Sequence, residues 1–163
     1  MSTVRVAIIR ATSIAVLLSF GMAGYAMAGG HVRGYDCSEF AKTFFRKPLK
    51  ATIAEFSDYD VDKQYAIYIC GNQYMHPPMI HLAEPFAKEG QKVVDFLKAR
   101  LLQASDDPTV RDIVLVFTWM ARQKTYDVVG DSDLMRITEE RVSRINNPDW
   151  RRLSEQNLDE IRG

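Results

Sequence analysis

The sequence predicts an all-α fold, a compact bundle of antiparallel helical hairpins. Three observations lead to this class. Apolar residues recur at helical spacing along most of the chain after residue 36. Asp-Pro and Asn-Pro signals, which are typical of helix starts, precede two segments near the C-terminus. The C-terminal half also matches itself when Gly90 is placed on Gly130, as expected if one hairpin is built twice.

The segment before Gly29 has the composition of a signal peptide. It holds Arg5 and Arg10, no acidic residue and a central apolar run. The run ends in Ala26-Met27-Ala28, which places small residues at both positions that a signal peptidase requires. We therefore expect cleavage between Ala28 and Gly29, and a periplasmic or secreted protein. An uncleaved membrane anchor is the alternative, because the apolar segment approaches the length that spans a bilayer.

The charge of the remaining chain excludes one class of partner. Without residues 1–28 it holds 19 basic and 21 acidic residues, a net charge of about −2 with His neutral. The basic residues are interspersed with acidic ones, whereas a nucleic-acid-binding surface needs a clustered basic excess. We expect a protein partner and no nucleic acid, with membrane contact only through an uncleaved signal.

Two cysteines, Cys37 and Cys70, both lie in the part expected to be exported. Export makes a disulfide between them the default expectation. Closing a loop of about 33 residues would stabilise the fold by roughly 3 to 4 kcal/mol in the chain-entropy account. A reactive or metal-bound thiol is the alternative, but no third Cys or nearby His completes such a site.

The exported part is expected to form a single all-α domain over residues 36–163 after a flexible, glycine-containing lead over residues 29–35. Asp36 or Ser38 can cap a first short helix, and Pro48 suits the first position of a second. A third helix is expected from Val61 to Gln73. Its YAIYIC core is rich in strand formers, so a strand is the alternative there.

Pro77-Pro78 marks the boundary between the N-terminal helices, residues 36–76, and the C-terminal half. A helix from Met79 to Lys88 is expected to bend near Pro85 and to end at Gly90, a left-handed stop residue. The next helix runs from Gln91 to Ala104, with a buried stripe of Val94, Leu97 and Leu101.

The stretch DDPTVRDIVLVF, from Asp106 to Phe117, opens the element that we expect at the centre of the fold. Asp106 or Asp107 can cap a helix here, with Asp107 preferred, and Pro108 fits its first turn. Asp112 would lie near the positive helix end. The following residues are apolar on every side, so Val110 to Arg122 should be a buried helix. A buried strand is the alternative, but length and the Asp-Pro start favour helix.

The internal match aligns positions that have a backbone or core role. With Gly90 on Gly130, Asp107-Pro108 falls on Asn147-Pro148, so the two expected helix starts coincide. Apolar positions also align, in the pairs Val94 with Leu134, Leu97 with Ile137, Leu102 with Val142, Val110 with Trp150, and Ile113 with Leu153. Shared helix punctuation between unrelated hairpins is the alternative explanation.

The motif Asp107-Pro108-Thr109-Val110-Arg111-Asp112 resembles the turn of the HEAT repeat family. Units of that family have about this length, and a Val-Arg pair after an acidic or Asn turn opens their second helix. Asn147-Pro148-Asp149-Trp150-Arg151 follows the pattern with Trp in place of Val. The resemblance covers about two units within residues 77–161. It implies a short α-solenoid packed on an N-terminal helical cap.

His76, His81 and Glu84 come closest to a metal or general-acid site. His81 and Glu84 lie one helical turn apart, the spacing that converging ligands need. The second His of an H-E-x-x-H pair is missing, and so is an evident third ligand. We therefore favour a helix-start His and a surface Glu, and we expect no metal and no cofactor.

Two further features suit either binding or packing. A cluster of tyrosines and methionines, made of Tyr65, Tyr68, Tyr74, Met75 and Met79, can line a partner groove or fill the core. The loop over residues 125–130 carries apolar and aromatic residues that can bind a ligand or fold back onto the core. Paired carboxylates such as Asp131 and Asp133 are expected to act as caps.

The sequence thus favours an exported, non-catalytic helical module that binds a protein. One form of it is an immunity or inhibitor protein, since small helical exported proteins with one disulfide are similar in general form to type VI secretion amidase immunity proteins. Another is an acid-stress chaperone, because the stretch from Tyr35 to Phe40 resembles the Cys-bearing helix start of such periplasmic proteins. A small metal-binding protein or hydrolase at His76, His81 and Glu84 is the alternative class.

Overall fold

The computed structural model describes residues 31–163, so the expected cleavage site between Ala28 and Gly29 lies outside the described residues. Within this range the chain forms eight α-helices, two short 3-10 helices and one two-stranded antiparallel sheet. The predicted all-α class is confirmed. None of these helices combines the length and the hydropathy needed to cross a lipid bilayer.

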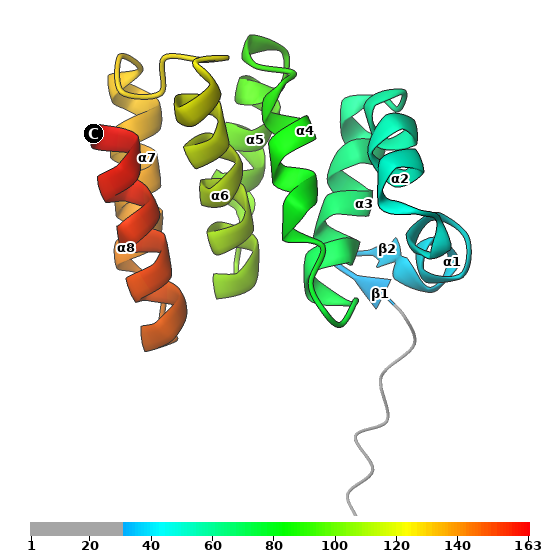
Figure 1. Cartoon of the computed structure of the whole chain (residues 1–163). Coiled ribbons are helices and arrows are strands. Elements are labelled where there is room, and N and C mark those ends of the chain that lie inside the picture. Colours follow the sequence, from blue (N-terminus) through cyan, green and yellow to red (C-terminus); the bar gives the residue numbers. More distant parts are fainter. Residues whose placement is uncertain (1–30) are drawn as a thin grey trace, which may run out of the picture.

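The helices lie in two layers (Figure 1). One layer contains α2 (Leu49–Ser57), α4 (Ala83–Ala87), α6 (Asp107–Gln123) and α8 (Pro148–Arg162). The layer behind it contains α3 (Val61–Gln73), α5 (Gln91–Gln103) and α7 (Ser132–Ser143). α6 packs most extensively against α8 on one side and α4 on the other, so it occupies the middle of the molecule.

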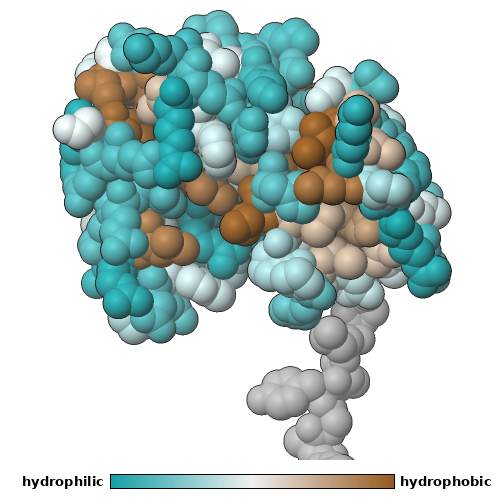
Figure 2. Space-filling view, viewed as in Figure 1, coloured by the Kyte–Doolittle hydropathy of each residue, from teal (hydrophilic) through white to brown (hydrophobic). Residues whose placement is uncertain are grey.

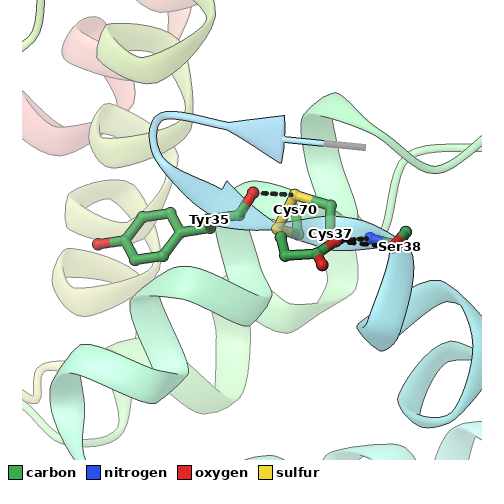
Figure 3. Close-up of a disulfide and its surroundings, with 5 residues drawn as sticks. Tyr35, Cys37, Ser38 and Cys70 are labelled. Atoms are coloured by element: carbon green, nitrogen blue, oxygen red, sulfur yellow. Dashed lines mark hydrogen bonds between the residues drawn. A yellow bond between two sulfur atoms is a disulfide. The ribbon is translucent and has the colours of Figure 1, made fainter. Parts of the chain in front are cut away.

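A β-hairpin stands where a flexible lead was expected, so that expectation is wrong for residues 31–35. β1 (His31–Val32) pairs antiparallel with β2 (Tyr35–Asp36). Tertiary contacts hold this short hairpin: Cys37, directly after β2, is bonded to Cys70 of α3, and both cysteines are fully buried (Figure 3). The predicted disulfide is therefore present in the structure.

In the N-terminal part, two helices begin at Asp side chains that accept hydrogen bonds from the first helical amides. The Asp36 carboxylate accepts a hydrogen bond from the Ser38 amide and starts α1 (Cys37–Lys42). A 3-10 turn, η1 (Phe44–Arg46), leads to Pro48, which precedes α2. The Asp60 carboxylate accepts from the Lys63 amide and starts α3, so the strand alternative for this segment is wrong.

The segment after Pro77-Pro78 is less regular than the single helix predicted from Met79 to Lys88. It forms a 3-10 turn, η2 (Ile80–Leu82), and then the short α4. Pro85 falls in the first turn of α4, where its missing amide costs no hydrogen bond, so no bend is needed. Gly90 ends the segment at φ 54°, and a Cβ there would lie 2.5 Å from the Thr125 carbonyl oxygen.

The expected helix at the centre of the fold is confirmed as α6, and its strand alternative is wrong. Asp106 is its N-cap rather than Asp107: Asp106 has extended backbone angles, and its carboxylate accepts from the Thr109 amide at 3.0 Å. Asp107 instead reaches the next corner, where its Oδ2 accepts from the amides of Asn146 (3.0 Å) and Asn147 (2.8 Å). Pro108 lies in the first turn as predicted.

The second hairpin repeats this arrangement in part. The Asn147 side chain accepts from the amides of Asp149 and Trp150 and starts α8, with Pro148 as its first residue. Burial follows the predicted repeat register at two of the five apolar pairs, Val94 with Leu134 and Leu97 with Ile137. The register fails at two other pairs. Leu102 is exposed but aligns with buried Val142, and Leu153 is exposed but aligns with buried Ile113.

Candidate functional site

The layer of α4, α6 and α8 carries an apolar groove, which we call the α4–α6–α8 groove. Its volume is about 190 Å³. Three segments contribute two residues each: Pro78 and Ile80 from the turn before α4, Arg111 and Leu115 from α6, and Leu153 and Asn157 from α8. This volume is below the ~300 to 1,000 Å³ of pockets that hold drug-sized ligands, and it suits a single large side chain.

Several of these apolar side chains are exposed to solvent. Ile80 is 56% exposed and Leu153 is 46% exposed, and Leu115 between them is half-buried. Figure 2 shows separate hydrophobic groups on this face among hydrophilic surroundings. Apolar groups that gather on a surface and are rimmed by polar residues are typical of interaction sites.

Arg111 forms the polar wall of the groove and is held from two sides. Its Nε and Nη2 atoms donate to Oδ1 of Asp112, at 2.9 and 2.6 Å. Its guanidinium also lies over the Trp150 ring of α8, 5.3 Å from the ring centroid. Because both partners are fixed by the fold, the wall is ordered before any ligand binds.

Asp112 has a role that sequence reasoning missed, since it was expected only as a charge near the positive helix end. Its side chain is fully buried, and Gln73 of α3 donates to its Oδ2 at 3.1 Å. Burial raises the pKa of Asp112 to about 6, although the charge and the hydrogen bonds of Arg111 and the hydrogen bond of Gln73 act to lower it. The signal that could have revealed this buried position is that Asp112 directly precedes a run of apolar residues expected to be buried.

The surroundings of Asp112 also join the N-terminal helices to the C-terminal helical hairpins. The Tyr68 hydroxyl donates to the main-chain oxygen of Asp112 at 2.8 Å, and Gln73 also donates to the Thr109 hydroxyl at 3.1 Å. Burial raises the pKa of Tyr68 well above 10, so this donor keeps its proton. α3 and α6 are therefore linked by buried polar bonds behind the groove wall.

The predicted metal candidates lie along one segment but do not form a site. His76 is exposed, whereas His81 is partly buried in η2 and has a lowered pKa because of that burial. Glu84 pairs with Lys88 at 3.5 Å. Within residues 31–163 no group of three or more His, Cys, Asp or Glu side chains is arranged to hold a metal ion.

The tyrosine and methionine cluster divides between core and surface instead of lining one groove. Tyr65 and Tyr68 are buried, and Tyr74, Met75 and Met79 are less buried than they are. The loop over residues 125–130 folds back onto the core through Val128, which is buried, while the Thr125 hydroxyl donates to the Ala87 carbonyl at 2.7 Å.

The paired carboxylates have structural roles. Asp131 accepts from the Leu134 amide at 2.9 Å as the cap of α7, and that bond lowers its pKa. Asp133 pairs with Lys98 and Arg136, and its pKa is lowered by these partners. Neither arrangement brings two carboxylates together for acid–base chemistry.

Known proteins provide no guide to this site. The chain matches no protein-family model, no curated protein and no solved structure.

Proposed function

We propose that the protein is an exported, non-catalytic helical module that binds a partner protein at the α4–α6–α8 groove. The observation that carries this proposal is the exposure of Ile80 and Leu153 around a pocket sized for one side chain. A few deep anchor positions surrounded by polar groups are the usual source of affinity in protein interfaces. Arg111, fixed by Asp112 and Trp150, supplies a preformed polar edge.

Export is supported by two independent features. The segment before Gly29 has the composition of a signal peptide. The chain also contains a buried disulfide between Cys37 and Cys70, and such bonds persist in oxidising compartments and are rare in the cytosol. The periplasm or the extracellular space is therefore the proposed location.

The proposed architecture is a pair of HEAT-like units on an N-terminal helical cap. Both second helices, α6 and α8, lie in one layer, and both first helices, α5 and α7, lie in the other (Figure 1). Asp107 links one corner to the next by accepting from the Asn146 and Asn147 amides. Stacked helical units of this kind present the aligned helices as a binding surface.

Paired variants and capture from native periplasmic extract test the function. The mature oxidised protein is immobilised as wild type, Leu153→Glu and Leu102→Glu. Leu102 is a matched control because it is 54% exposed and lies on α5, in the other layer. We expect wild type and Leu102→Glu to retain the same partner, and Leu153→Glu to lose it by about 10-fold or more, since an unpaired charge would be buried in the groove.

Two results would contradict the proposal. One is a partner retained equally by Leu153→Glu and wild type. The other is the absence of any protein retained specifically by the wild type. Intact mass of the chain recovered from the host periplasm checks export separately, because cleavage after Ala28 and loss of two hydrogens at Cys37 and Cys70 each change the mass.

A further inference from the structure

A second, smaller pocket lies away from the groove, between the β-hairpin, α3, α5 and the corner before α6. We call it the hairpin pocket. Its volume is about 130 Å³. Polar side chains contribute much of its lining, in particular Arg33, Tyr35, Tyr65, Arg100, Gln103 and Ser105. The disulfide fixes the hairpin that forms one wall, and Figure 3 shows the Tyr35 ring pointing away from the two sulfur atoms.

The Tyr65 hydroxyl is the feature that points to a ligand. Tyr65 is 4% exposed as a residue and lines the pocket, and its hydroxyl, which forms no hydrogen bond within residues 31–163, is the part that is open to solvent there. Tyr68, three residues along the same helix, shows the usual arrangement, since its hydroxyl donates to Asp112 at 2.8 Å. The Tyr65 hydroxyl is thus a donor beside the pocket with nothing from the described chain to receive it.

Tyr65 keeps its proton at any physiological pH. Burial raises the pKa of Tyr65 to about 12. The hydroxyl is therefore neutral, and it can donate a hydrogen bond to an acceptor in the pocket.

Two guanidinium groups stand beside this tyrosine. Arg100 lies over the rings of Tyr65 and Phe96, at 5.3 and 4.8 Å from their centroids. Its ion pair is with Asp62, which is 75% exposed, so that pair is well hydrated and exchangeable. Arg33 pairs with Asp106 and donates to the Ser105 hydroxyl at 3.4 Å. Each guanidinium has five N–H donors, so both retain donors beyond these contacts.

Hydrogen-bond donors and size, rather than net charge, indicate the ligand, because Asp106 pairs with Arg33 and Asp62 pairs with Arg100. Two arginines and one aspartate, Asp106, line the pocket, and donors outnumber acceptors. Its volume of about 130 Å³ is below the ~300 to 1,000 Å³ of pockets that hold drug-sized ligands. That space holds a small oxyanion group and is too small for a nucleotide or another large cofactor.

We infer that the hairpin pocket binds a small oxyanion, either a phosphate or a carboxylate group, through the Tyr65 hydroxyl and the guanidinium groups of Arg33 and Arg100. Planar guanidinium groups suit both anions, and charge-assisted hydrogen bonds are the strong ones. This site does not depend on the proposed protein partner, because it shares no residue with the α4–α6–α8 groove.

Titration of the mature oxidised protein with inorganic phosphate and, separately, with acetate tests the inference. Binding is followed by calorimetry and by amide NMR shifts, at constant ionic strength set with chloride. Wild type should bind at least one probe saturably, with a Kd of roughly 1 mM or tighter. Phosphate alone would identify the phosphate form, and acetate alone the carboxylate form.

Matched variants make the result specific. Tyr65→Phe keeps the ring and should weaken binding about 10-fold or more, as should Arg100→Gln, which keeps the inference testable if the first variant does not fold. Tyr126→Phe is the control, because its hydroxyl is bonded to Asp131 outside the pocket, and it should bind as wild type does. Absence of saturable binding of both probes, or equal affinity in Tyr65→Phe and wild type, would overturn the inference.

Discussion

The two C-terminal hairpins start their second helices in the same way and use them differently. α6 and α8 both have an Asp or Asn cap and a proline in the first turn. α6 then buries nine of its residues, whereas α8 buries three, Ser154, Leu158 and Ile161. The local signals fix where a helix begins, and the neighbours decide which faces are covered.

This difference assigns the two helices separate roles. α6 lies between α4 and α8 and forms the centre of the core. α8 contacts α6 and α7, and on its surface toward α6 Leu153 stays 46% exposed at the rim of the groove. The proposed binding groove arises where the largely buried α6 meets the more exposed α8.

The largest expected difference is in stability, between substitution of a core side chain of α6 and substitution of an exposed side chain of α8. Phe117 is fully buried, so Phe117→Ala should lower the free energy of unfolding by about 3 to 5 kcal/mol. Leu153→Ala should change it by less than about 0.5 kcal/mol. Urea denaturation of the oxidised protein measures both, and similar losses for the two variants would contradict the assignment.

A smaller effect should appear at the buried carboxylate of α6, as a dependence on pH. The pKa of Asp112 is about 6 in the fold against an ordinary 3.8, so the folded state holds the proton more tightly than the unfolded chain. Stability from this group is complete below the unfolded pKa and is lost as pH rises through the folded pKa. As pH falls from about 6 toward 3.8, wild type should therefore gain roughly 1 kcal/mol per pH unit relative to Asp112→Asn.

Denaturation of both proteins across that pH range measures this difference. A difference that stays constant, or that grows in favour of Asp112→Asn as pH falls, would contradict the assignment. The acid-stress chaperone alternative predicts exposure of apolar surface on acidification, which dye binding detects.

Loss of the hydrogen bonds between Asp107 and the turn before α8 should lower stability moderately. Asp107→Ala removes the acceptor for the Asn146 and Asn147 amides, so it should cost about 1 kcal/mol and loosen the second hairpin first. Asp95→Ala, on the exposed side of α5, is the control and should be close to neutral. Hydrogen exchange that speeds up equally along α6 and α8 would argue against a role in holding α8.

The smallest effect should come from the ion pair between Arg122 of α6 and Glu160 of α8. Both side chains are partly exposed, at 45% and 39%, so a double-mutant cycle should give a coupling of roughly 0.2 to 1 kcal/mol that falls with added salt. A coupling that does not depend on salt would indicate a pair shielded from water, contrary to this exposure.

Local chemistry made much of the fold predictable. Asp36 and Asn147 cap helices as expected, because each side chain bonds to amides two or three residues away. The disulfide followed from the presence of two cysteines in a chain expected to be exported. These predictions needed no knowledge of distant contacts.

Contacts between distant segments account for what the sequence did not reveal. Asp112 is buried because Gln73, 39 residues earlier, packs against it, and no local pattern encodes that approach. The groove combines three segments that are separate in the chain. Leu102 aligns with a buried residue in the repeat but is exposed, because the surroundings of the two hairpins differ.

Site-specific photo-cross-linking in living cells is the most direct test of the groove as the working surface. A photoreactive residue is placed at Leu153 or, as the matched control, at Leu102. The proposed function predicts one discrete adduct with a partner protein from position 153 and none from position 102. No adduct from position 153, or the same adducts from both positions, would contradict it.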